Sequence, residues 1–180
     1  MKKNLTFAIV GTSALGMPLT NIIIRHFKRI KKVFLIDPDT WQKHESYKHI
    51  LSKRNHENMA KVDVARQLIK EYNPSIRVQE IRQKAQSTEA KKALKKTNII
   101  IACVDNDTTR LDLQVFATQY KKILLDLSAQ IIGEQRIGTI RIYIPGKTPC
   151  LVCQGLNLAN IMTDTLRQAK ARTGYLKGKL

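Results

Sequence analysis

The chain has 180 residues, of which 43% are hydrophobic and 26% charged, and its formal net charge is +18. This length and composition indicate one globular domain, and a membrane span is excluded because no run of about 18 apolar residues occurs. Three cysteines are too few for a disulfide framework and the first residues do not resemble a signal peptide, so we expect a cytoplasmic protein.

The segment from Phe7 to Asp39 predicts a strand (7–10), a tight turn from Gly11 to Gly16, a helix and a second strand (33–36). The helix should bury the apolar face formed by Leu15, Leu19, Ile22, Ile23 and Phe27. Backbone N–H groups at such a turn bind phosphate, and an acid about 20 residues further on can bind a ribose. The segment therefore predicts a nucleotide site. An ordinary βαβ turn that needs two glycines remains the alternative, because Ser13 occupies the position of the middle glycine.

Helices and strands continue to alternate along the chain. A polar stretch (40–58) forms a long loop or loose helical segment and holds most of the histidines, which we expect at the surface. After it we predict a helix (59–72), a strand (77–81), a helix capped by Ser87, a strand (98–104), a helix (108–120) and two strands (123–127 and 138–144). The fold class is α/β: a Rossmann-like, doubly wound, mostly parallel sheet with helices on both faces.

Acidic side chains follow two of these strands: Asp37 and Asp39 follow one, and Asp105 follows another. Ligands bind outside the carboxyl ends of the strands in such sheets. Asp105 with Asn106 suits Mg²⁺, which prefers one or two carboxylates together with phosphate oxygens. The alternative is that Asp105 caps the helix that begins near residue 108.

Basic residues outnumber acidic residues by 32 to 14, which favours an acidic partner such as a nucleic acid, an acidic protein or a phosphorylated ligand. The alternative is that the scattered Lys and Arg pairs are solvated helix faces and helix C-termini, since no aromatic residues are interleaved for base stacking. Lys61, at the start of a helix, and Lys48, in the long loop, are candidate phosphate contacts, although each is also one lysine among many.

Cys150 and Cys153 have the C-x-x-C spacing of half a zinc site. No second C-x-x-C is present, so Zn²⁺ requires histidines or a second chain to complete the site. A redox pair is the alternative, but such a motif belongs near the first βα turn. Cys103 lies in an apolar strand and is expected to be a core residue.

The order of these motifs resembles the ThiF/MoeB/HesA-type adenylating enzymes, the superfamily that includes the ubiquitin-activating enzymes. The matching pieces are Gly11 to Gly16, Asp37-Pro38-Asp39, Lys61, Asn73-Pro74, Asp105-Asn106 with Arg110, and 145–150 with Cys153. On this resemblance residues 1–156 form the adenylation domain. Residues 157–180 form a basic tail or the start of a crossover region whose remainder, with a second C-x-x-C, would lie beyond Leu180.

The resemblance implies that the chain binds ATP and Mg²⁺ and adenylates the C-terminal carboxylate of a ubiquitin-like or sulfur-carrier protein or of a peptide, as a homodimer. Asp37 would bind the ribose, Lys61 the triphosphate and Asp105 the Mg²⁺. The remaining implied nucleotide contacts are Gly11, Ser13, Ala14, Gly16, Asp39, Asn106 and Arg110, and Lys48 would have a catalytic role.

The chain departs from the family pattern at four positions. Ser13 and Ala14 replace glycines of the turn, and Glu45 and Lys48 replace an Asn and an Arg. A carboxylate beside a triphosphate is unfavourable, and Lys does not replace Arg as a bidentate clamp. Two alternatives therefore stay open: a non-catalytic subunit that pairs with a complete enzyme, and a tRNA- or nucleic-acid-linked relative.

Overall fold

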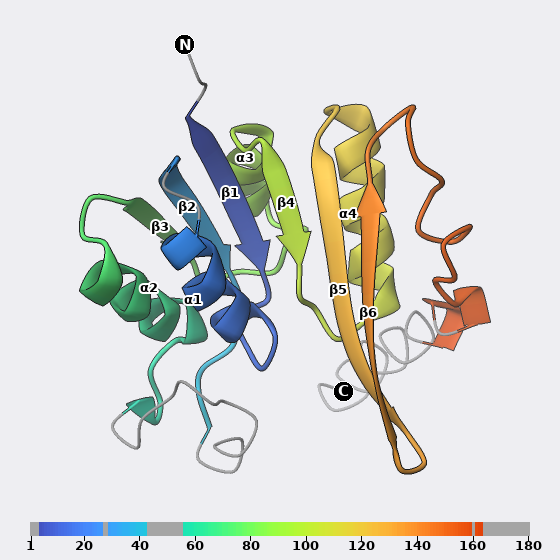
Figure 1. Cartoon of the computed structure of the whole chain (residues 1–180), viewed down its shortest axis with the longest axis horizontal. Coiled ribbons are helices and arrows are strands. Elements are labelled where there is room, and N and C mark those ends of the chain that lie inside the picture. Colours follow the sequence, from blue (N-terminus) through green and yellow to red (C-terminus); the bar gives the residue numbers. More distant parts are fainter. Residues whose placement is uncertain (1–3, 27–28, 43–55, 160, 164–180) are drawn as a thin grey trace, which may run out of the picture.

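The computed structural model describes residues 4–26, 29–42, 56–159 and 161–163. In this part of the chain, six strands form a sheet in the order β3-β2-β1-β4-β5-β6, with helices on both faces (Figure 1). The elements in chain order are β1 (Leu5–Val10), α1 (Gly16–His26), β2 (Ile30–Ile36), α2 (Lys61–Tyr72), β3 (Arg77–Ile81), α3 (Thr88–Lys95), β4 (Ile99–Ala102), α4 (Asp107–Gln119), β5 (Ile123–Ile132) and β6 (Gln135–Tyr143).

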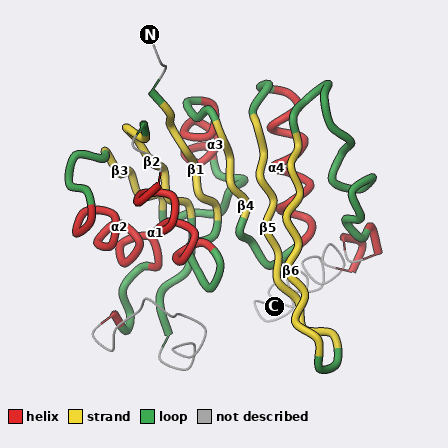
Figure 2. Tube along the Cα trace, in the orientation of Figure 1, coloured by secondary structure: helices red, strands yellow, loops and turns green. Residues whose placement is uncertain are grey.

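Five strands run parallel, and β6 pairs antiparallel with β5. Helices α1 and α2 cover one face, and α3 and α4 cover the other, as Figures 1 and 2 show. The predicted α/β fold with a mostly parallel sheet is therefore confirmed. Within the described residues, no helix combines the length and the apolarity needed to cross a bilayer.

The core consists of two apolar layers, one on each face of the sheet. In β1, Phe7 and Ile9 pack with α1 and α2, whereas Ala8 and Val10 pack with α3 and α4. Successive side chains of a strand point to opposite faces, so a central strand covered on both sides must be apolar throughout. This explains why β1 is a continuous apolar run.

Two predictions about the elements were wrong in detail. Ile22 is 53% exposed, because the buried stripe of α1 runs through Thr20, Ile23 and Ile24 instead; Phe27 lies outside the described residues. Strands β5 and β6 are longer than predicted, since their antiparallel pairing continues to Ile132↔Gln135, well past the last partner that β4 offers to β5. Strand pairing therefore extends a polar segment that has no strand-like apolar pattern.

Candidate nucleotide-binding site

The turn between β1 and α1 packs so closely that two of its residues must be glycine. Gly11 has a φ of +86°, and a Cβ there would lie 2.6 Å from the carbonyl oxygen of Cys103, at the end of β4. A Cβ on Gly16 would lie 1.9 Å from the carbonyl oxygen of Gly11. The backbone thus folds back tightly into α1, whose first N–H groups lack intrahelical partners. Ser13 and Ala14 also lie in this turn, and the carbonyl of Ser13 accepts a hydrogen bond from the N–H of Met17.

Asp37, the first residue after β2, ties the end of that strand to the turn. Its Oδ2 accepts hydrogen bonds from the N–H (2.7 Å) and hydroxyl (3.1 Å) of Thr12, and its Oδ1 accepts one from the N–H of Asp39 (3.0 Å). Burial raises the pKa of Asp37, while the hydrogen bonds from the backbone N–H groups of Thr12 and Asp39 act in the opposite direction. The structure therefore places the predicted ribose ligand against the predicted phosphate turn.

Lys61 comes to the same edge of the sheet from α2. Its side chain is 5% exposed and its Nζ lies 3.4 Å from Oδ2 of Asp39, whose own side chain is 64% exposed. The backbone N–H of Lys61 also donates to the carbonyl of Asp39 (2.9 Å), and a bridge between Thr40 and Ala60 holds the two segments together. Because protein atoms rather than solvent surround this side chain, the protein holds the Lys61 ammonium group in position.

The long loop before Lys61 is closed at its base. Trp41 is 2% exposed and exchanges backbone hydrogen bonds with Asn58 and Met59. His56 is 5% exposed, so the prediction that the histidines lie at the surface was wrong for this residue. Its burial follows from the packing of the loop base, which has no sequence pattern. The predicted contact Lys48, with Glu45, His44 and His49, lies outside the described residues.

Asp105 and Asn106 follow β4, which is the direct neighbour of β1 in the sheet. Asn106 is the N-cap of α4, because its side chain accepts a hydrogen bond from the N–H of Thr109 (2.8 Å). The alternative that Asp105 caps this helix was therefore wrong. Asp105 is exposed, and its carboxylate has a 3.4 Å contact with the amide of Asn106. An exposed carboxylate at this strand end has the oxygen chemistry that Mg²⁺ requires.

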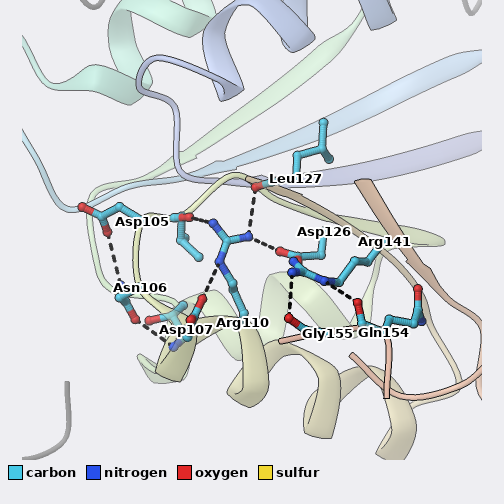
Figure 3. Close-up of polar contacts among 11 residues, drawn as sticks. Asp105, Asn106, Asp107, Arg110, Asp126, Leu127, Arg141, Gln154 and Gly155 are labelled. Carbon is cyan, nitrogen blue, oxygen red and sulfur yellow. Dashed lines mark hydrogen bonds and ion pairs between the residues drawn. The ribbon is translucent and has the colours of Figure 1, made fainter. Parts of the chain in front are cut away.

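Arg110, a predicted nucleotide contact, is 3% exposed and is held within the protein (Figure 3). Its guanidinium donates to the carboxylate of Asp126, to the carbonyl of Val104 and to the carbonyl of Leu127 (2.9 Å), and it lies 3.3 Å from Asp107. Arg110 thereby fixes the backbone next to Asp105. A direct role of Arg110 at the nucleotide stays a prediction.

Asp126 joins Arg110 to a second arginine that sequence analysis missed (Figure 3). Asp126 is 0% exposed, and its Oδ2 accepts a hydrogen bond from Arg141 (2.9 Å). Arg141 also donates to the carbonyls of Gln154 (3.2 Å) and Gly155 (3.3 Å). Asp126 was the clue that the sequence offered to this network: it is an acid within the apolar strand 123–127, and a buried carboxylate requires a cationic partner.

The C-x-x-C turn brings its two thiols together. The Sγ atoms of Cys150 and Cys153 are 3.2 Å apart and both cysteines are free. Hydrogen bonds from Cys153 lower the pKa of Cys150, and the hydrogen bond with Cys150 raises that of Cys153. No group of three metal-ligating side chains occurs in the described part of the chain. Cys103 is buried, with a pKa raised to about 12 by burial, as expected for a core residue.

Comparisons with known proteins agree with this fold. Residues 2–177 match the sequence model of the ThiF family. The chain is 27% identical over 152 residues to the adenylyltransferase and sulfurtransferase MOCS3 of Drosophila willistoni, covering 84% of this chain and 32% of that protein. Among solved structures, it is similar to E. coli MccB with ATP (19% identity, 94% of this chain and 48% of MccB, TM-score 0.68). It is also similar to E. coli tRNA N6-threonylcarbamoyladenosine dehydratase, TcdA (20%, 73% and 56%, TM-score 0.60). The chain thus spans about a third of MOCS3 and about half of the two E. coli proteins.

Proposed function

Because the chain belongs to the ThiF family, we propose that it binds ATP with Mg²⁺ and adenylates a C-terminal carboxylate. An oxygen of the carboxylate attacks the α-phosphorus of ATP, the bond from that phosphorus to the bridging oxygen breaks, and pyrophosphate leaves. The product is an acyl-adenylate. The acceptor that suits this reaction is the C-terminus of a ubiquitin-like or sulfur-carrier protein or of a peptide, bound to a homodimer of the chain.

The observation that carries the proposal is the meeting of Lys61 with the Asp37–Asp39 segment beside the glycine turn. The side chain of Lys61 is 5% exposed and lies 3.4 Å from Asp39, and Asp37 contacts the turn directly through Thr12. A dinucleotide site of the hydride-transfer type needs the turn and the acid but no buried lysine. A lysine at this point supplies the positive charge that a triphosphate requires.

Each residue then has a separate task. Asp37 would accept hydrogen bonds from the ribose, and the N–H groups of the turn, including those of Ser13 and Ala14, would face phosphate. Lys61 would exchange part of its contact with Asp39 for the triphosphate. Asp105 would hold Mg²⁺, which neutralises phosphate charge when bound, while Asn106 holds the start of α4 in place. Catalysis of this kind depends on positioning and charge neutralisation.

A non-catalytic binding subunit is the second candidate, and two observations favour it. The carboxylate of Asp37 already accepts three hydrogen bonds from the protein, and Ser13 and Ala14 add side chains to a turn that is tightly packed. Such a subunit would bind ATP weakly or not at all while retaining the fold.

Calorimetric titration of Mg²⁺-ATP into the wild type, Lys61→Ala and Asp105→Ala separates the two candidates. Asp112→Ala is the matched control, because Asp112 is an exposed acid on α4. The adenylating enzyme requires binding by the wild type and the control, a loss of affinity in both site variants, and pyrophosphate exchange with a carrier protein. No binding by the folded wild type at millimolar nucleotide would refute the enzyme and favour the subunit.

A further inference from the structure

Exposed cations gather on the edge of the sheet opposite the candidate nucleotide site. Strands β1 to β5 are parallel, so every connection from a helix into the next strand lies at the edge where these strands begin. We call this the amino edge; in Figure 1 it is the upper edge, where β1 starts. Its exposed basic residues include Arg29, Lys31, Arg77, Lys95, Lys96 and Lys121.

Helix capping does not account for this charge. Lys70 donates to the carbonyls of Pro74 (2.9 Å) and Ile76 (2.7 Å) after α2. Lys122 donates to the carbonyls of Lys95 (2.7 Å) and Thr97 (2.7 Å) after α3. These two lysines already satisfy carbonyl groups in the connections after α2 and α3. Of the cations named above, Lys95 lies in the last turn of α3, whereas Arg29, Lys31, Arg77 and Lys121 lie outside the helices.

Within the described residues, acids do not neutralise the amino edge, because the exposed Glu71 at the end of α2 is outnumbered there by the cations. The ion pairs within the described part of the chain join Asp39, Asp63, Glu80, Asp107 and Asp126 to basic residues, and none uses a cation named above for the edge. Asp39, Asp105 and Asp107 instead lie near the strand ends at the opposite edge. The fold therefore places positive and negative charges at opposite edges, and the cations of the amino edge repel one another unless an anion binds there.

Two aromatic rings lie among these cations. Tyr72, at the end of α2, is 46% exposed, and the guanidinium of Arg25 lies 4.7 Å from its ring centroid. Tyr120, at the end of α4, has the Nζ of Lys95 at 4.6 Å from its centroid. The sequence shows no interleaving of aromatic and basic residues, because these partners come from different helices. Rings beside cations are the arrangement that binds unstacked bases next to phosphates.

We propose that the amino edge binds the phosphate backbone of a nucleic acid, with Tyr72 available to stack on a base. The band of exposed cations provides affinity through counterion release, and the exposed ring favours nucleic acid over an acidic protein or an anionic membrane. The surface is separate from the candidate nucleotide site, so this binding does not depend on ATP.

The test measures fluorescence anisotropy of a labelled single-stranded RNA of about 20 nucleotides between about 50 and 200 mM KCl. The variant is Lys96→Gln with Lys121→Gln. The matched control is Lys84→Gln with Arg136→Gln, which removes the same charge from exposed residues away from the amino edge. We expect the slope of log affinity against log salt to become shallower by about 1.4 in the variant, about 0.7 for each phosphate that is no longer neutralised, and to stay closer to the wild-type slope in the control.

A further variant and other ligands distinguish nucleic acid from the other possible partners of the amino edge. Tyr72→Leu should weaken RNA binding while leaving the salt slope unchanged, because it removes stacking but no charge. Equal weakening in the Lys96/Lys121 variant and its control would overturn the assignment to this edge. Binding of phosphatidylserine vesicles or polyglutamate with no binding of RNA or duplex DNA, or no binding of nucleic acid even at low salt, would overturn the proposal while leaving the ATP titrations unaffected.

Discussion

Replacing Asp126 by asparagine tests the buried ion network that holds the backbone beside Asp105. Asp126 is 0% exposed, and the side chains of its partners Arg110 and Arg141 are 4% and 11% exposed. Asparagine keeps the volume but removes the carboxylate that pairs with Arg141, and it leaves Arg110 paired with Asp107 alone (3.3 Å). Removing one member of a buried ion pair costs about 3–5 kcal/mol. Because the amide oxygen still accepts one hydrogen bond, we expect a decrease in stability at the lower end, about 3 kcal/mol.

Urea and thermal unfolding followed by circular dichroism measure this decrease. In a chain of this size, about 3 kcal/mol lowers the Tm by roughly 6–12 °C. Asp112→Asn is the control, because Asp112 is exposed and accepts a 2.8 Å hydrogen bond from Gln86; its effect should stay within about 0.5 kcal/mol. A decrease below about 1 kcal/mol in Asp126→Asn would refute the reasoning. The double variant with Arg141→Met should be destabilised by less than the sum of the single variants, since both act on one network.

Individual residues of the site lead to three further predictions. Gly16→Ala should destabilise the fold and weaken ATP binding, because its Cβ would lie 1.9 Å from a carbonyl oxygen. Gly138→Ala is the control and should be tolerated, because a Cβ there meets open space. Unfolding curves and ATP titrations compare the two variants. Burial raises the pKa of Asp37, so this group makes the free energy of unfolding fall as the pH rises from the ordinary aspartate pKa to the raised one. Carbon NMR should show Asp37 titrating above an ordinary aspartate, and ATP affinity should fall as the pH drops through the same midpoint. An ordinary midpoint would contradict this. N-ethylmaleimide should modify the two thiols of the C-x-x-C turn in the native protein but not Cys103, because burial raises the pKa of Cys103 to about 12. Mass spectrometry counts the adducts. A third adduct on the native protein would show that Cys103 is accessible and contradict this prediction.

The sequence predicted those features of the fold that depend on a single type of residue. Apolar runs at 7–10 and 98–104 predict buried strands because a strand covered on both faces has no polar side. Gly11 and Gly16 mark the two positions of the turn where a Cβ would not fit. The position of Lys61 at a helix start made it one candidate phosphate contact among many lysines, and only the family resemblance distinguished it from the others.

Other features of the site have no signature along the chain. The burial of His56 depends on how the base of the long loop packs, and the pairing of Asp126 with Arg110 and Arg141 joins two strands and a helix. Capping by Asn106 rather than Asp105 differs by one residue, which is within the ordinary uncertainty of helix boundaries.

The order of apolar runs and turns along the chain determined the α/β class and the positions of the strands, because these depend on neighbouring residues. Only the tertiary structure decided which charges meet. The carboxyl ends of the parallel strands β1 to β5 lie at one edge of the sheet, so Lys61 reaches Asp39 there. Exposed lysines and the rings of Tyr72 and Tyr120 collect at the opposite edge. Electrostatic and stacking interactions depend on distance in space, and that distance is set by topology rather than by separation in sequence.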